Sequence, residues 1–257
     1  MFDTHLHTTF SCDSSMSSLE AIEAAAGSGL GIIITEHLDL DYPENPEEFV
    51  FDIDEYFSSL DRYRSETVLL GVELGLRTDC NEENRKAVHG KPFDEIIGSI
   101  HVVGSMDIYR PSFTKGRPKQ EAYRSYFSAM LECIKTFDDF DTLGHVDYIC
   151  RYARYDDTNI YVAEFYDEWT AVCKALLEKE KALELNTRRL GDKNAVSALK
   201  GLYKRYKELG GKYITIGSDA HRTSDIGAHF SVAKDFSREL GLQAVYFKKR
   251  KMYQEGF

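Results

Sequence analysis

The feature that most constrains the fold of this 257-residue chain is a regular alternation of short β-rich runs with longer amphipathic stretches. This alternation is typical of βα units arranged around a parallel sheet. Seven runs have the length and apolar character of strands, and they span residues 1–7, 31–37, 67–75, 94–103, 141–148, 181–187 and 212–221. We interpret residues 243–257 as an eighth strand with a tail.

Five amphipathic stretches between these runs predict helices, and they span residues 17–29, 55–65, 120–137, 163–181 and 196–211. The first begins with Ser17 and Glu20 in capping-box spacing and ends at Gly27 or Gly29. Polar residues 39–49, 77–93 and 104–120 are predicted loops that follow the carboxyl ends of strands, where barrel proteins build their sites. No linker divides the chain, so we expect one α/β domain over residues 1–257.

Composition excludes several classes of partner. A formal net charge of -11 argues against a nucleic-acid backbone, which needs a basic surface. The five cysteines are odd in number and form no CxxC pair, which favours reduced thiols in the cytoplasm. The chain has no apolar run long enough for a bilayer and no signal peptide at its start. We therefore expect a cytoplasmic protein with a small-molecule partner, and its oligomeric state stays open.

Potential metal ligands collect at the ends of the predicted strands. His5 and His7 lie two residues apart on the first strand, so both imidazoles share one face. Asp219 and His221 repeat this spacing at the end of the seventh strand. The intervening strands contain or end with Glu36, His37, Glu73, His101 and His145. Since the carboxyl ends of parallel strands meet at one edge of the sheet, we expect these groups to converge.

Each residue also has a plainer interpretation. His101 or His145, taken alone, is more often a hydrogen-bonded structural histidine than a ligand, and Glu73 alone suits a buried partner of an arginine. Asp13 lies in a serine-rich stretch and suits a turn. The joint placement of six histidines at strand ends favours metal binding. His89 and His229 fall outside this pattern and are interpreted as solvent-facing or supporting residues.

The segments DTHLHT, TEH, GSIH with GHVD, and GSDAH resemble the motifs of the polymerase and histidinol phosphatase (PHP) family, from residue 3 to about residue 221. The resemblance implies a distorted (β/α)7 TIM-like barrel that holds two or three divalent cations. The ligands that it implies are His5, His7, Asp13, His37, Glu73, His101, His145, Asp219 and His221. Within the family, GVELG, IIGSIHVV, LELNT and GSDAH most resemble the stand-alone histidinol-phosphate phosphatases, which implies hydrolysis of L-histidinol phosphate in histidine biosynthesis.

Nine ligands exceed the capacity of one tetrahedral site, so they predict two or three metal ions. Mixed nitrogen and oxygen donors suit zinc, iron or manganese. A centre of this kind activates a water for attack on phosphorus and neutralises charge on the attacking and leaving oxygens. We expect the activated, bridging hydroxide to be held by Glu73, Asp219 and His7. Cys12 lacks a phosphate-loop context and is interpreted as incidental.

A phosphate dianion also favours arginine, whose planar fork matches its oxygens. Arg154 and Arg188 are the first candidates, followed by Arg151, Arg189 and Arg222. Each of them also suits a basic surface loop. The acidic stretch at residues 39–49 is a candidate lid for the cationic part of histidinol phosphate, through Asp39 and Asp41, and it equally suits a solvated loop.

Other functions remain open at this point. One is a related phosphoesterase that acts on another small phosphomonoester or a nucleotide, and the acidic charge disfavours a nucleic-acid end. An amidohydrolase also begins with HxH on a barrel strand, but it usually needs a bridging lysine, and no strand here ends in a well-placed one. A catalytically silent metal-binding scaffold would have lost a bridging ligand, whereas here the whole set is present.

Overall fold

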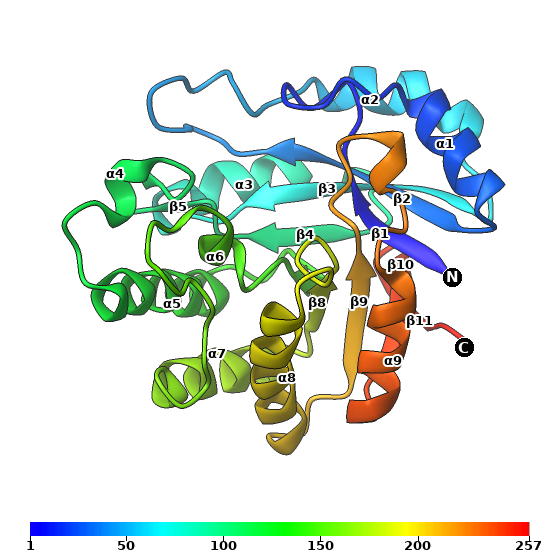
Figure 1. Cartoon of the computed structure of the whole chain (residues 1–257). Coiled ribbons are helices and arrows are strands. Elements are labelled where there is room, and N and C mark those ends of the chain that lie inside the picture. Colours follow the sequence, from blue (N-terminus) through cyan, green and yellow to red (C-terminus); the bar gives the residue numbers. More distant parts are fainter. Residues whose placement is uncertain (257) are drawn as a thin grey trace.

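In this computed structural model, the described residues 1–256 form one α/β domain built on a nine-stranded sheet (Figure 1). Its order is β1-β2-β3-β4-β7-β8-β9-β10-β11, so strands follow one another as they do in the chain. The bounds are Phe2–Leu6 (β1), Gly31–Leu38 (β2), Val68–Gly75 (β3), Ile96–Ser99 (β4), Thr142–Leu143 (β7), Ala182–Asn186 (β8), Tyr213–Gly217 (β9), Gln243–Lys248 (β10) and Lys251–Gln254 (β11). Neighbours from β1 to β10 pair in parallel, whereas β11 pairs antiparallel with β10. Each of the seven predicted runs contains a strand of this sheet, whereas residues 243–254, interpreted as one strand and part of a tail, hold the two strands β10 and β11.

Helices flank the sheet, with α1 beside β2 and α9 beside β10 (Figure 1). Their bounds are Ser18–Gly27 (α1), Ile53–Leu60 (α2), Asn81–Val88 (α3), Pro111–Thr114 (α4), Lys119–Thr136 (α5), Tyr148–Tyr152 (α6), Tyr166–Glu178 (α7), Lys193–Glu208 (α8) and Phe230–Leu240 (α9). The Ser17–Glu20 capping box is present at the start of α1. The five predicted helices are therefore confirmed, with ends that shift by a few residues.

The two-residue period of the central strands separates two faces of the sheet. One face packs into the main core through Ile32, Ile34, Leu70, Val72 and Leu74. The other face changes character along its length. At the amino ends of β2 and β3 it carries Ile33 and Leu69, which cluster with Phe2 and Tyr246. We call these four residues the apolar floor. At the carboxyl ends the same face carries histidine and carboxylate side chains, so the strands place a polar site above an apolar base.

The first strand also lies next to the end of β9. Leu6 forms a parallel bridge with Ala220, where the His7 amide donates to the Ala220 carbonyl at 2.9 Å. The Asp219 amide donates to the His5 carbonyl at 2.7 Å. β10 occupies the amino-terminal part of β9 instead, through Tyr213 and Ile214. These contacts bring the two ends of the chain's β structure together beside the candidate ligands.

Two of the predicted loops contain regular secondary structure, so these predictions were wrong. Residues 77–93, predicted as a loop, contain a short 3-10 turn at Thr78–Cys80 and helix α3. Residues 104–120 contain β6 (Met106–Asp107), which pairs with β5 (Val102–Val103) in a separate ribbon, and also α4. In α3 only Asn84 and Val88 are buried, so its apolar pattern is too sparse to reveal a helix. Among residues 1–256, no helix combines the length and hydropathy required to cross a bilayer.

Candidate metal centre

All nine candidate ligands lie at one end of the sheet, on segments that are far apart in the sequence. They are His5 and His7 of β1 and its end, Asp13 of the following loop, His37 of β2, Glu73 of β3, and His101, His145, Asp219 and His221 just after β4, β7 and β9. Eight of them are buried or nearly so, whereas the side chain of Asp13 is 41% exposed. The expected convergence is therefore present in the structure.

Glu73 occupies the middle of this constellation. Its Oε1 lies 2.7 Å from His145 Nε2 and 3.2 Å from His101 Nε2. Its Oε2 lies 2.9 Å from His37 Nδ1, but neither of these two atoms has a well-oriented hydrogen bond among the described residues. A fully buried carboxylate oxygen that faces nitrogen atoms without hydrogen-bond geometry fits a shared cation. One carboxylate thus faces ligands on two sides.

A second group consists of His5, His7 and Asp219. The two Nε2 atoms of His5 and His7 lie 3.1 Å apart, and His7 Nε2 lies 3.5 Å from Asp219 Oδ1. Glu73 Oε2 is 3.4 Å from His5 Nε2. Glu73 therefore joins this second group to the first group, which consists of Glu73, His101 and His145. One nitrogen or oxygen atom from each of the three residues falls within a space that suits a single metal ion.

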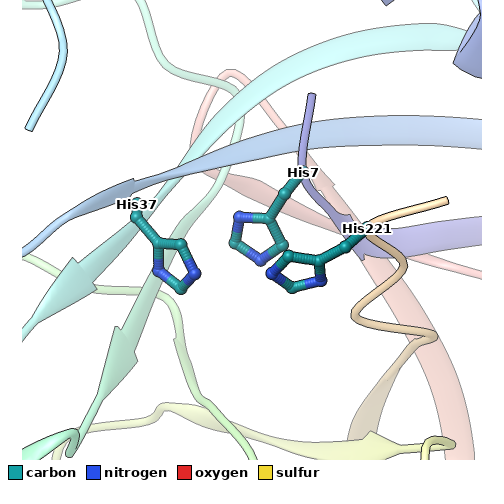
Figure 2. A group of neighbouring side chains, drawn as sticks. All are labelled: His7, His37 and His221. Carbon is teal, nitrogen blue, oxygen red and sulfur yellow. The ribbon is translucent and has the colours of Figure 1, made fainter. Parts of the chain in front are cut away.

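The third group lies nearer to solvent and contains Asp13, His37 and His221. Asp13 Oδ2 is 3.6 Å from His37 Nε2 and 3.1 Å from His221 Nε2. Figure 2 shows the rings of His37, His7 and His221 pointing toward one another from three different segments. The His7 ring lies between the other two, with ring centroids 4.1 Å and 4.3 Å away. Asp13 is therefore placed to hold an ion at the open side of the centre.

The charges of the buried groups suit cation binding. Burial by itself raises the pKa of Glu73, but His5 and His101 lower it, and the net pKa lies well below the usual value. Burial by itself also raises the pKa of Asp219, but Arg151 and His5 lower it, and the net pKa again lies well below the usual value. For His7, burial and the neighbouring His37 and His221 lower the pKa well below its usual value. Neighbouring carboxylates outweigh burial and raise the pKa of His5, His37 and His101, so the carboxylates of this site favour cations, either protons on these imidazoles or metal ions that displace them.

Further residues, which the sequence did not single out as ligand partners, orient these imidazoles. Glu184 Oε1 accepts from His5 Nδ1 at 2.7 Å, and Asp39 Oδ1 lies 2.8 Å from His101 Nδ1. Ser11 Oγ contacts His7 Nδ1 at 3.2 Å and donates to Glu36. Partners of this kind fix the ring tautomer so that the other nitrogen faces the metal. Glu184 was detectable as a lone carboxylate inside the apolar strand ALELN.

Glu36, Asp39 and Asp41 take roles that differ from simple expectation. Glu36 points away from the ligands and accepts from Thr8 and Ser11. Asp39 is buried against His101, and Asp41 is exposed and lies outside the cavity lining. The idea of an acidic lid at residues 39–49 is therefore limited to Asp39 on the cavity side.

A polar cavity of about 350 Å³ opens beside the ligands, and Arg151, Arg188 and Arg222 contribute to its wall. Arg151 Nη1 donates to Asp219 Oδ2 at 2.5 Å, whereas its Nε and Nη2 have no hydrogen-bond partner among residues 1–256. Arg188 Nη1 donates to the Asp219 carbonyl at 2.9 Å. A guanidinium with free N–H groups beside a cavity is suited to an anion.

The other two candidate arginines are placed elsewhere. Arg154 is exposed and does not line this cavity. Arg189 donates to Asp147 Oδ2 at 3.0 Å and to Asn159 Oδ1 at 2.7 Å, away from the cavity lining. This placement does not support the preference for Arg154 over Arg151, because Arg151 lines the cavity and Arg154 does not.

A second cavity of about 290 Å³ adjoins the first and shares Asp13, His37, His101, Tyr148 and Tyr152 with it. Its remaining lining is aromatic and acidic, and consists of Asp39, Tyr42, Phe49, Asp107 and Tyr109. The Tyr42 hydroxyl donates to Asp107 Oδ2 at 2.5 Å. Aromatic faces and carboxylates together favour a cationic or heteroaromatic group.

His89, His229 and Cys12 lie outside the centre, as expected. Each is exposed, and the ring of His229 packs over Gly191. The five cysteines are free in the described part of the chain. These residues carry no role in the candidate site.

Comparisons with known proteins agree with this geometry. The PHP domain model matches residues 3–188. A probable histidinol-phosphatase of Clostridium acetobutylicum is 46% identical over 98% of both chains. The histidinol-phosphatase of Lactococcus lactis is 34% identical over 85% of this chain and 83% of its own length.

The crystal structure of histidinol phosphate phosphatase from Lactococcus lactis, complexed with zinc, L-histidinol and phosphate, has a TM-score of 0.93 to this chain. It is 31% identical and covers 98% of both chains. The match of the domain model to most of the chain, together with these relatives, confirms the family resemblance: the chain belongs to the PHP family.

Proposed function

We propose that this chain hydrolyses L-histidinol phosphate to L-histidinol and phosphate, as a metal-dependent phosphomonoesterase of histidine biosynthesis. The observation that carries the proposal is the arrangement of three ligand groups, two of them joined through Glu73, beside an arginine-lined cavity. Relatives named histidinol-phosphatase and the Lactococcus lactis structure with zinc, L-histidinol and phosphate support the choice of substrate.

The fold that we propose for this function is a distorted (β/α)7 barrel, with residues 1–257 as one phosphoesterase domain. The bridge between Leu6 and Ala220 supports closure between β1 and the end of β9. The insertion of β10 beside the first part of β9 accounts for the distortion. We also propose that the protein works in the cytoplasm without a nucleic-acid partner, as its free thiols and acidic charge suggest.

The donor set fits two or three divalent ions, and the crowded, poorly hydrogen-bonded Glu73 Oε2 is the structural observation behind this fit. We assign His5, His7, Glu73 and Asp219 to one ion, Glu73, His101 and His145 to a second, and Asp13, His37 and His221 to a third. Zinc, iron and manganese all suit these donors. Bound there, the ions supply an activated water nucleophile and neutralise phosphoryl charge.

The chain's own residues then bind and orient the substrate. Arg151 and Arg188 hold phosphoryl oxygens in the polar cavity, because both line it, Arg188 is anchored beside Asp219, and two buried nitrogen atoms of Arg151 have no partner among residues 1–256. Arg222 contributes positive charge at the rim. Glu73, Asp219 and His7 surround the position from which an attacking water approaches phosphorus.

The adjoining aromatic cavity receives the cationic amine and imidazole of histidinol. Asp107 supplies negative charge and is held by the Tyr42 hydroxyl, while Tyr148 and Tyr152 offer ring faces at the junction of the two cavities. The combination of a phosphate-binding wall and an acidic aromatic wall matches both ends of histidinol phosphate. A generic phosphomonoester uses only the first wall.

Three substrates test the proposal: histidinol phosphate, an aryl phosphate monoester and a phosphodiester, each with and without a chelator. We expect the highest kcat/KM for histidinol phosphate and its loss after chelation. A preference for another phosphomonoester would transfer the protein to a related phosphatase function. Diester cleavage would favour a nuclease-like function, and no turnover with metal bound would favour a scaffold.

A further inference from the structure

Two consecutive arginines after β8 point in different directions. Arg188 lines the polar cavity, whereas Arg189 reaches Asp147 and Asn159. The Arg189 and Asp147 side chains are only 15% and 5% exposed. Phosphate binding by Arg188 and Arg151 leaves this neighbouring ion pair without an assigned role.

Asp147 is also close to Arg151. It occupies the N-cap position of α6, and Arg151 follows four residues later, so the two side chains lie on the same side of this short helix. The pKa of Arg151 is raised: burial by itself lowers it, but the negative charge of Asp219 and then that of Asp147 raise it. Asp147 pairs with Arg189 and forms no ion pair with Arg151, which pairs with Asp219 instead, so the two carboxylates divide the two arginines between them.

A buried carboxylate needs a partner, because an unpaired charge in the interior is costly. Arg189 Nη1 is that partner at 3.0 Å. Without Arg189, the cation left for Asp147 is Arg151, which already feels the charge of Asp147 and whose buried Nε and Nη2 have no hydrogen-bond partner among residues 1–256. These are the same donors that the proposed phosphate site uses.

We propose that Arg189 is a positioning residue: by pairing with Asp147 and Asn159, it keeps Asp147 away from Arg151 and leaves the Arg151 guanidinium free for the substrate's phosphoryl group. This inference rests on the proposed function, since it assumes a phosphate in the arginine-lined cavity. It assigns different tasks to two neighbouring arginines that were both candidates for phosphate binding, with Arg188 ranked ahead of Arg189.

The test compares R189M, D147N and the double variant R189M/D147N, with inorganic phosphate as the probe. R189M should raise both KM for histidinol phosphate and the inhibition constant of phosphate by about tenfold, equivalent to about 1.4 kcal/mol, with a smaller change in kcat. D147N should leave both constants near wild type, although it breaks the same ion pair. The double variant should recover most of the phosphate affinity lost in R189M.

A merely structural ion pair gives a different pattern. D147N would then weaken phosphate binding as much as R189M, and the double variant would show no recovery; either result overturns the proposal. Thermal melts and metal content accompany each variant. If R189M does not fold, R189Q serves in its place, since glutamine also lacks the positive charge, and D147N must still retain phosphate affinity.

A matched control is R124M, which removes a surface pair with Glu168 between α5 and α7. It should leave KM and phosphate inhibition unchanged, and a comparable loss there would overturn a specific role for Arg189. Failure of the proposed function is distinguishable, because the wild-type protein would then neither hydrolyse histidinol phosphate nor be inhibited by phosphate.

Discussion

The two ends of one face of the sheet differ sharply. At the amino ends of the strands, the apolar floor contains Phe2, Ile33, Leu69 and Tyr246, with the Phe2 and Tyr246 rings stacked 4.2 Å apart. A few residues further along the same strands, His37 and Glu73 belong to a buried polar site. Burial of the apolar floor stabilises the folded state, whereas the polar end buries charges that are costly unless partner side chains or cations compensate them. Residues that stabilise the fold and residues of the polar site thus lie at opposite ends of the same strands.

The largest expected effect comes from the polar end. Glu73→Gln removes the carboxylate that faces both sides of the centre, so hydrolysis of histidinol phosphate should fall by about 10²- to 10³-fold, the scale observed when a charge-stabilising group is lost. Bound metal should fall with it, as measured by elemental analysis. Glu83→Gln, on the exposed side of α3, is the control and should leave both unchanged. Full metal content with full activity in Glu73→Gln would contradict this assignment.

The matching change in the floor is Leu69→Ala. Loss of a buried leucine should lower the free energy of unfolding by about 2–5 kcal/mol, measured by denaturant titration. The kcat of the remaining folded protein should stay near wild type, because Leu69 contacts no ligand. Leu19→Ala at an exposed position provides the comparison. A large fall in kcat without loss of stability would break the separation between the two ends.

Arg151→Met tests the anion side of the polar end. We expect kcat/KM for histidinol phosphate to fall by about 30- to 100-fold, since removal of a partly buried charged donor to an anion costs about 2–3 kcal/mol. Arg154→Met, three residues away and exposed, should have no effect. Steady-state kinetics with both variants decide which arginine binds phosphate, and the reverse ranking would restore Arg154.

The smallest effect should come from a partner of a ligand. Glu184→Gln keeps the side-chain shape but removes the charge that orients His5, so zinc affinity should fall by about 10- to 100-fold. Competition with a chromophoric chelator measures this change. Glu178→Gln at the exposed end of α7 should match wild type. Unchanged zinc affinity in Glu184→Gln would show that His5 needs no carboxylate for its orientation.

The strand-end pattern predicts the convergence of ligands because parallel strands necessarily bring their carboxyl ends to one edge. The sequence alone is therefore enough to place His5, Glu73 and Asp219 together. Glu184 was missed because it lies inside β8 and not at its carboxyl end, and its contact with His5 depends on how side chains from separate strands face one another. The sequence pattern also does not predict the bridge between Leu6 and Ala220 that the structure contains.

The arginines show a different limit. Arg151 and Arg154 are three residues apart, and the sequence does not reveal that α6 ends at Tyr152, which leaves Arg154 outside the helix. Likewise α3 was predicted as a loop because only two of its side chains are buried. Where an element is short or mostly solvated, the apolar period that identifies it is too weak, and side-chain direction follows from tertiary contacts.

The hydrogen bonds between β1 and the segment after β9 have a consequence for biosynthesis of the protein itself. His5 and His7 leave the ribosome well before Asp219 and Ala220, the residues that anchor them, because most of the strands of the sheet are made in between. A nascent or truncated chain therefore holds an incomplete ligand set. Cations would meet the complete ligand set only after the segment that follows β9 has been made and has paired with β1.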